Sequence, residues 1–199
     1  MNSDHEGCHP YRTISPLTTA GVFPLVNGRV VFQAGPDQTG EQIGLVRIGG
    51  HIEPGESPWD CACREAMEEA SVCVTPLDAP VTYCLDTDTP EVVPWSDMTP
   101  QPLHCSATSQ IFLGTSADAP KPSSETRGLI LLSPSDLRSL TETEHTLASL
   151  AERGSEILLR DPSEQDHLYT LPVAPRWAGR LASVLAMHAE LTLWDSSKE

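Results

Sequence analysis

Two apolar runs near the start of the chain are separated by a dipeptide that favours a tight turn. Ala20–Val26 and Arg29–Gln33 are rich in valine and phenylalanine, and Asn27-Gly28 lies between them. Both central residues of a type I′ turn need a positive φ angle, which asparagine and glycine adopt readily. The segment is therefore predicted to form a β-hairpin, the first element of the fold.

A helix is predicted further along the chain from its start signal and its spacing. Ser57 suits the N-cap position, Pro58 the first helical position and Asp60 the first turn. From there the apolar side chains recur at the spacing of one helix face, at positions 59, 62, 63, 66, 67 and 70. The pattern predicts a helix over Ser57–Ala70.

The rest of the chain alternates short apolar runs with polar turns, and its last third is helical in character. Ile43–Ile48 is a short apolar run that ends in Gly49-Gly50. Strands are predicted at Val72–Val74, Val81–Leu85, Gln110–Leu113 and Leu129–Leu132. Helices are predicted after Ser133-Pro134, over Glu142–Leu159 with an interruption near Gly154, and over Arg176–Trp194. The proline-rich stretch 86–102 is predicted to be an inserted loop, and residues 1–12 a flexible N-terminal tail.

The composition is that of a globular protein, and its charge disfavours some classes of binding partner. Of 199 residues, 28 are acidic and 12 are basic, which gives a net charge of −16. A surface this acidic does not favour a nucleic acid polymer, whose phosphates bind clustered lysine and arginine. No apolar run reaches about 18 residues, so no membrane span is expected. Without a signal-like apolar start, the six cysteines are expected to be reduced and the location cytoplasmic.

Three glutamates of the predicted helix carry the candidate chemistry. Glu65, Glu68 and Glu69 stand at i, i+3 and i+4, which places their carboxylates on one side of the helix, about one turn apart. Carboxylates this close repel each other unless a cation lies among them, and Mg²⁺ prefers oxygen ligands of this kind. A bare acidic helix face is more often a solvated surface, so the metal site depends on the residues around it.

The segment from Gly50 to Val72 resembles the Nudix box, G-x5-E-x7-R-E-U-x-E-E-x-G-U, in which U is aliphatic. Seven of its nine defined positions match at the required spacing: Gly50, Glu56, Arg64, Glu65, Glu68, Glu69 and Val72. Ala66 is smaller than the usual aliphatic residue, and Ser71 replaces the final glycine. Ser71 is expected to be left-handed, which costs a serine about 1 kcal/mol.

The resemblance implies an α+β fold, an α/β/α sandwich in which a mixed β-sheet lies between helices. It covers roughly residues 18–140, where the hairpin, the box, the later strands and a further acid all have a place. A Nudix hydrolase domain is accordingly expected over residues 13–140. The helical C-terminal extension over residues 141–199 is expected to pack on this domain or at the interface of a homodimer.

The resemblance also implies roles for the residues of the box. The expected ligands of Mg²⁺ or Mn²⁺ are the carbonyl of Gly50 and the carboxylates of Glu65, Glu68 and Glu69, with Glu65 and Glu69 as the catalytic pair. Glu56 and Arg64 would support the loop and the helix. The implied reaction is attack of a metal-bound water on a phosphorus of a diphosphate bridge.

Other residues are candidates for the general base and for substrate contacts. The resemblance implies that the base is a glutamate of the box or an acid such as Glu125, in a later loop. Arg47 and Arg127 are candidate phosphate contacts because cations are scarce, and Trp95 could stack on a base. His104, followed by a cysteine beside a strand, has no partner pattern that would support catalysis.

Two function classes stay open. The first is a metal-dependent Nudix hydrolase that cleaves the diphosphate bond of a nucleoside triphosphate, a nucleotide sugar or a similar small molecule. The second is a Nudix-fold sensor that binds a nucleotide without hydrolysis. Sensor forms often lose the acids of the box, which are intact here, so the hydrolase is favoured. An isopentenyl-diphosphate isomerase-like enzyme would need a cysteine motif that the sequence does not show.

Overall fold

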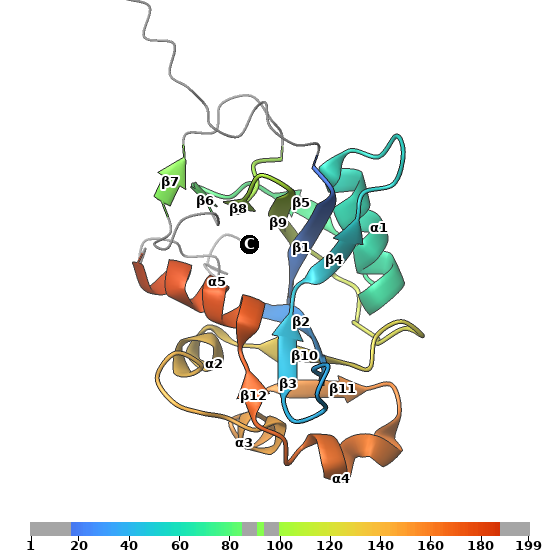
Figure 1. Ribbon diagram of the computed structural model, residues 1–199, viewed down its shortest axis with the longest axis vertical. Coiled ribbons are helices and arrows are strands. Elements are labelled where there is room, and N and C mark those ends of the chain that lie inside the picture. The colour runs from blue at the N-terminus through green and yellow to red at the C-terminus, as the bar shows by residue number, and fades with distance from the viewer. Residues whose placement is uncertain (1–16, 85–90, 94–99, 188–199) are drawn as a thin grey trace, which may run out of the picture.

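The fold is described from a computed structural model, which covers residues 17–84, 91–93 and 100–187. A mixed β-sheet lies between helices, with α1 (Pro58–Ala70) on one face (Figure 1). The other face is covered by α2 (Pro134–Ser139), α3 (Leu147–Glu152) and α5 (Arg176–Met187), and the short η1 (Pro162–Glu164) and α4 (Gln165–Leu168) lie in the C-terminal part. The predicted α+β class and α/β/α layering are confirmed.

Within the described ranges the sheet has twelve strands. Its main path runs β11-β10-β2-β1-β9-β8-β6-β7, with β3 and β12 branching from β2, β4 pairing with β1 and β5 with β9. The strands are β1 Thr19–Val26, β2 Arg29–Pro36, β3 Ile43–Val46, β4 Ile48–His51, β5 Thr75–Leu77, β6 Thr82–Cys84, β7 Glu91–Val93, β8 His104–Cys105, β9 Ser109–Thr115, β10 Gly128–Leu132, β11 Glu156–Leu159 and β12 Val173–Ala174.

Strand alternation divides the core between the two faces of the sheet. In β1, Phe23 and Leu25 belong to the apolar cluster under α5, whereas Val22 and Val26 belong to the cluster under α1. Successive side chains of a strand point to opposite faces, so one strand serves both clusters. The hairpin turn has the predicted geometry, since both of its central residues have positive φ angles, 49° and 71°.

β1 and β2 separate beyond the hairpin turn, and the segment 43–51 fills the opening between them. Its first half, β3, pairs with β2, and its second half, β4, pairs with β1. Arg47 is the residue between the two strands, at the point where the segment crosses from one partner to the other. This crossing brings Gly49 and Gly50 beneath helix α1, with which β4 is in contact.

Helix α1 starts as predicted and lies close to the sheet. The Ser57 hydroxyl accepts from the Asp60 amide, and the Asp60 carboxylate accepts in turn from Ser57, which completes a capping box. Ala62, Ala66 and Ala70, spaced by four residues, are fully buried against the strands. Their small side chains let the helix backbone approach β4 closely, so Ala66 fits the surface that this helix presents.

Two local predictions are wrong. Val72–Val74 is not a strand: the amide of Val72 donates to the carbonyl of Ala66 as the chain leaves α1, and β5 begins at Thr75. Glu142–Leu159 is not mainly helical, because α3 ends before Gly154, whose φ is 98°, and residues 156–159 pair with β10 as β11.

Other sequence predictions fall partly or wholly outside the described residues. The predicted tail 1–12, Trp95 and the C-terminal part of the predicted helix Arg176–Trp194 are among them, whereas α5 covers that helix as far as Met187. The helix predicted after Ser133 is confirmed as α2. Among the described helices, none is long and apolar enough to cross a lipid bilayer.

The left-handed residue at the end of α1 generates a stability prediction. Ser71 has φ 57° and ψ 34°, and its amide donates to the carbonyls of Ala66 and Met67. Ser71→Gly is expected to raise the free energy of unfolding in urea by about 1 kcal/mol, because glycine has no Cβ to strain in this conformation. Ser71→Ala is the control and should bring no such gain. Equal stabilisation by both variants would contradict the prediction.

Candidate active site

Arg64 joins three glutamates to the loop that precedes α1. Its Nε lies 2.7 Å from Glu56, and one terminal nitrogen lies 2.9 Å from Glu65 and 2.7 Å from Glu68. The other terminal nitrogen donates to the main-chain carbonyl of His51 at 2.9 Å. A guanidinium can hold these partners together because its five donors are fixed in a planar fork. The hydrogen bond with Glu56 contributes most to raising the pKa of Arg64 above its ordinary value.

Glu69 lies deeper, between α1 and β4. Its carboxylate accepts a hydrogen bond from the amide of Gly49 at 2.9 Å. Burial raises the pKa of Glu69 to about 7, although the hydrogen bond from Gly49 acts in the opposite direction. Repulsion from Glu65 adds to the rise, whereas Gln33 and Arg47 favour the charged form. The sequence did not indicate Gln33 as part of the site, although it is a polar residue in an otherwise apolar strand.

The two glycines of β4 are required by this close packing. A Cβ on Gly50 would lie 2.6 Å from the carboxyl carbon of Glu65, so any side chain there would displace the carboxylate. Gly49 has φ 147°, and a Cβ on it would overlap the guanidinium of Arg47 and the carbonyl of Ala20. The main chain of β4 therefore reaches the carboxylates directly.

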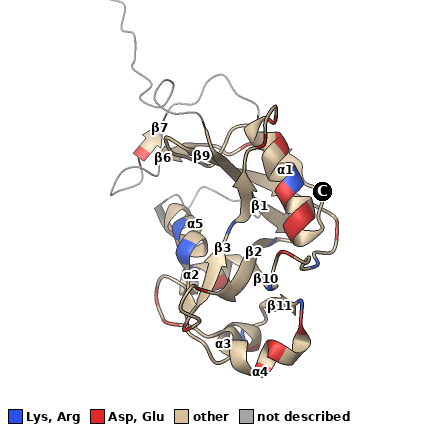
Figure 2. Ribbon diagram, turned by 45° about the vertical axis from the view of Figure 1, so that its right-hand side comes forward, with Lys and Arg blue, Asp and Glu red and all other residues tan. Residues whose placement is uncertain are grey.

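The charge and the donor atoms of this cluster fit a hard divalent cation, but its carboxylates do not point to one common position. The cluster contains more carboxylates than guanidinium groups, as the acidic face of α1 in Figure 2 shows. Oxygen ligands with excess negative charge suit Mg²⁺ or Mn²⁺. Among the described residues, however, no three acidic, histidine or cysteine side chains converge where a metal ion could be held. Glu65 and Glu68 are turned to Arg64 instead, so metal binding would require them to exchange this partner.

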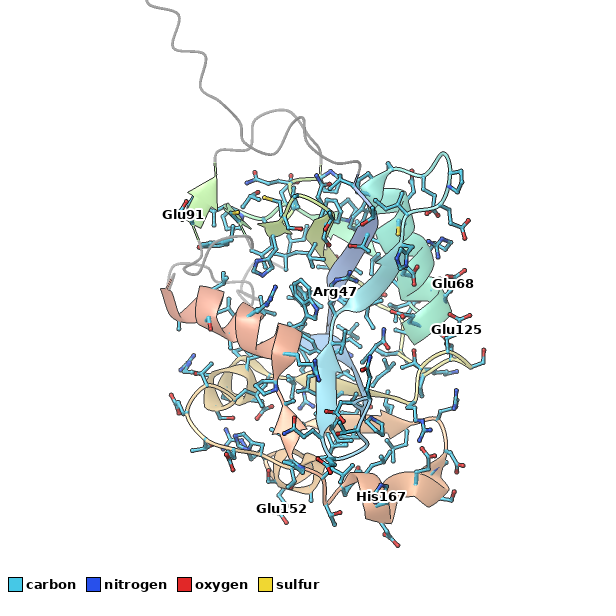
Figure 3. All side chains as sticks on the ribbon, in the orientation of Figure 1. Arg47, Glu68, Glu91, Glu125, Glu152 and His167 are labelled. Atoms are coloured by element: carbon cyan, nitrogen blue, oxygen red, sulfur yellow. The ribbon has the colours of Figure 1, made fainter. Side chains whose placement is uncertain are left out.

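Arg47 is not an exposed phosphate contact. It is 8% exposed, donates to the carbonyl of Ala20 at 3.2 Å, and its guanidinium carbon lies 5.4 Å from the ring centre of Trp177. Figure 3 shows Arg47 in the middle of the molecule, between α5 and strand β4. Burial lowers the pKa of Arg47, while Glu69 opposes the change.

The remaining predicted site residues are Glu125 and Arg127, which belong to one loop, and Trp95. The loop 116–127 is tied to the C-terminal end of α1, because the amides of Lys121 and Ser123 donate to carbonyls of its last residues. Glu125 is exposed in this loop and lies on the same side of the molecule as Glu68 (Figure 3). Arg127 forms an ion pair with Glu164 at 3.0 Å. Trp95, the candidate stacking residue, lies outside the described residues.

The match to a family decides the assignment. The model of the NUDIX domain matches residues 16–174, most of the chain, including the whole segment from Gly50 to Val72. The chain belongs to the Nudix family. The resemblance found in the box and the prediction of a Nudix hydrolase are thereby confirmed, and the matched range also contains β11 and β12.

Two solved structures are similar to this Nudix chain over much of their length. A possible asymmetric diadenosine tetraphosphate hydrolase from Jonesia denitrificans has a TM-score of 0.50 and 15% identity, over 90% of this chain and 98% of that one. A Nudix family hydrolase from Clostridium perfringens has a TM-score of 0.45 and 20% identity, over 63% and 86%. No curated protein matches the sequence significantly. At these identities the likeness concerns the fold alone.

The buried carboxylate of Glu69 generates a pH-dependent prediction. Folding raises the pKa of Glu69 from 4.5 to about 7, so the folded state favours the protonated carboxyl. The contribution of Glu69 to the free energy of unfolding is therefore greatest below pH 4.5 and is lost as the pH rises through 7. Glu69→Gln cannot ionise and can still accept from Gly49. Without metal it is expected to be more stable than the parent at pH 8, by on the order of 1 kcal/mol, and by little at pH 4.5.

Urea unfolding in the presence of EDTA at pH 4.5, 6 and 8 measures this difference. Glu68→Gln is the matched control, because the Glu68 side chain is 45% exposed and bonded to Arg64. The control should show no gain at pH 8. If both variants gain stability in the same way, the burial of Glu69 is not the cause.

A second prediction concerns the guanidinium of Arg64. Arg64→Lys is expected to lower the free energy of unfolding by about 1–2 kcal/mol, since an ammonium cannot hold Glu56, Glu68 and the His51 carbonyl at once. Arg153→Lys is the control, because Arg153 is half exposed and makes one 3.4 Å ion pair with a carboxylate. Its cost should stay below about 0.5 kcal/mol. A loss at Arg64 no larger than at Arg153 would contradict the network.

Proposed function

We propose that this Nudix chain is a Mg²⁺- or Mn²⁺-dependent pyrophosphohydrolase that cleaves the diphosphate bond of a small nucleotide, such as a nucleoside triphosphate or a nucleotide sugar. The observation that carries the proposal is the packing of Glu65 and Glu69 against the glycines of β4. The carboxylate of Glu69 accepts from the amide of Gly49, that of Glu65 occupies the space of a Gly50 Cβ, and Glu68 is exposed at the rim. This set offers oxygen ligands and excess negative charge on neighbouring turns of one helix.

The residues of the box have separate tasks in this proposal. Glu65 and Glu69, with the carbonyl of Gly50, would hold the ion, and Glu68 would join after leaving Arg64. A bound ion would lower the pKa of a water ligand and offset the charge of the diphosphate. Arg64 would keep Glu56 and the preceding loop in place through its bonds to Glu56 and His51.

The general base is proposed to be Glu125 or a glutamate of the box. Glu125 is supported by its exposure and by the loop that ties it to the C-terminal end of α1. An exposed carboxylate at this place could take a proton from a water that attacks a diphosphate held by the helix. Within the described residues Glu125 forms no ion pair, in contrast to Arg127 in the same loop.

The nucleotide class of the substrate is supported by charge and by one structural relative. The net charge of −16 disfavours a nucleic acid polymer but not a small anion accompanied by a divalent cation. The Jonesia denitrificans protein is named for a dinucleoside polyphosphate, a compound with phosphoric anhydride bonds. A small nucleotide with such a bond is the substrate class we propose.

Hydrolysis of a nucleotide panel tests the proposal. The parent is expected to release phosphate or pyrophosphate, or to form a nucleoside monophosphate, from at least one of about thirty compounds with Mg²⁺ or Mn²⁺, and to lose this activity in EDTA. Glu65→Gln and Glu69→Gln are each expected to lower kcat at least about 100-fold, because a neutral amide is a poor ligand for a hard cation. Glu125→Gln should lower kcat at least about tenfold if Glu125 is the base.

Glu152→Gln is the matched control for these changes, because Glu152 is an exposed glutamate of α3, far from α1 in Figure 3. Its activity should equal that of the parent. If the parent binds a nucleotide in calorimetry but hydrolyses none with either metal, the protein is a nucleotide sensor and the hydrolase proposal is overturned.

A further inference from the structure

His104 is buried on the α5 face of the sheet, and its two side-chain nitrogens are unpaired among the described residues. Its side chain is 1% exposed, and within residues 17–84, 91–93 and 100–187 neither Nδ1 nor Nε2 has a hydrogen-bond partner. Buried polar groups in native proteins are nearly all hydrogen-bonded, because an unpaired one costs stability. A core histidine whose two nitrogens are unpaired among the described residues is therefore a candidate to bind a ligand.

Aromatic rings surround this histidine. The ring centres of Phe23, Tyr83 and Trp177 lie 6.0, 6.2 and 6.3 Å from that of His104, and all three rings are inclined to the imidazole. Phe23 and Tyr83 are buried, whereas Trp177 of α5 is only half-buried. Of the three aromatic side chains around His104, Trp177 is thus the one that is accessible to solvent.

Two guanidinium groups lie against the indole of Trp177. Their central carbons are 5.4 Å (Arg47) and 4.8 Å (Arg180) from its ring centre. Among the described residues, the Nε of Arg47 is buried without a hydrogen-bond partner, and Arg180 is exposed and forms no ion pair. In a protein with 12 basic residues and 28 acidic ones, two arginines lie on one indole, and neither forms an ion pair within the described residues. This arrangement favours an anionic or electron-rich ligand.

The same arginine connects these rings to the glutamates of α1. The guanidinium of Arg47 lies against Gly21 and Gly49, where no Cβ is in its way. The amide of Gly49 in turn donates to Glu69. One bound molecule could therefore contact the rings with one end and the carboxylate site with the other.

The chemistry of His104 indicates which chemical group of a bound molecule would contact the rings. Burial, together with the nearby charge of Arg180, lowers the pKa of His104 to about 3, so the imidazole is neutral at physiological pH. A neutral imidazole has one N–H donor and one nitrogen acceptor. The edge of a nucleobase carries complementary acceptors and donors, and its flat face packs on aromatic rings and guanidinium groups. Ribose and phosphate alone have no such face.

We propose that His104, Trp177 and Arg180 form the subsite for the heteroaromatic base of the substrate, with His104 as its hydrogen-bonding specificity residue. The proposal rests on the proposed function for the nucleotide nature of the ligand. The base enters by displacing the half-buried indole of Trp177, and Arg180 packs on its outer face. The diphosphate then extends past Arg47 toward Glu65 and Glu69.

Binding without metal tests this subsite independently of hydrolysis. AMP, GMP, CMP and UMP are compared with ribose 5-phosphate by calorimetry in EDTA. The parent is expected to bind at least one of the four about tenfold more tightly than ribose 5-phosphate. His104→Phe should lower this preference about tenfold or more, because the favoured base then leaves its own polar groups unpaired, and should leave the affinity for ribose 5-phosphate unchanged.

Arginines one turn apart on α5 provide a matched pair. Arg180→Gln is expected to weaken binding of the favoured monophosphate several-fold, since it removes the guanidinium beside Trp177. Arg176→Gln should not weaken binding, because Arg176 is also exposed but extends toward Asp37, 3.8 Å away. Equal effects of both changes would indicate general electrostatic attraction and would overturn the assignment of Arg180.

Thermal unfolding separates recognition from a structural role of the histidine. His104→Phe should keep or raise the Tm, because phenylalanine leaves no buried polar atom unpaired. If it does not fold, Trp177→Leu takes its place and should also abolish the base preference. The proposal is overturned if the parent binds no nucleoside monophosphate more tightly than ribose 5-phosphate. It is also overturned if the folded variant keeps the parent's base preference, which is the result expected when the partner of His104 is a buried water.

The two proposals fail in different ways. Base preference in EDTA that depends on His104, without hydrolysis in Mg²⁺ or Mn²⁺, would remove the hydrolase and keep the subsite. Hydrolysis without a base preference that depends on His104 would do the reverse.

Discussion

The close approach of helix α1 to strand β4 is the constraint on which the rest of the site depends. Three alanines spaced by four residues form the buried face of the helix, and two glycines of β4 lie opposite the carboxylates. Larger residues at either place would separate the two backbones. The amide of Gly49 could then no longer reach Glu69, and Glu65 would move into solvent. Backbone proximity, rather than acidity alone, turns this helix face into a candidate metal site.

The same proximity creates an electrostatic problem that two arginines address from opposite sides. Glu65 and Glu69 repel each other in a partly dry environment, which contributes to the raised pKa of Glu69. Arg64 holds the outer carboxylates, and Arg47 approaches from the opening between β1 and β2. Because the segment 43–51 crosses that opening, Arg47 is in reach of both faces of the sheet. The charge of the α1 face and the aromatic groups of the α5 face are therefore physically linked.

Local signals made the hairpin, α1 and α2 predictable, because turn and capping residues act over a few positions. The same signals could not predict the structure of Val72–Val74 or Glu142–Leu159. A hydrogen bond to Ala66 sets the conformation of the first segment, and pairing with β10 makes the end of the second a strand. The ligand set of the site could be proposed from spacing, but the binding of Glu65 and Glu68 to Arg64 depends on side-chain geometry. Burial of Arg47 and the unpaired nitrogens of His104 are likewise tertiary properties.

Ala66 and Ser71, the two departures from the box consensus, preserve the close packing of α1 on β4 and the left-handed end of α1. Ala66 continues the row of Ala62 and Ala70, so a larger aliphatic side chain would push the helix away from β4 in this particular protein. Ser71 takes the left-handed conformation of the glycine that it replaces, and its amide still bonds the last carbonyls of the helix. The price is backbone strain at one residue. Both changes leave every charged group in place, and for that reason an altered consensus here is no argument against metal binding.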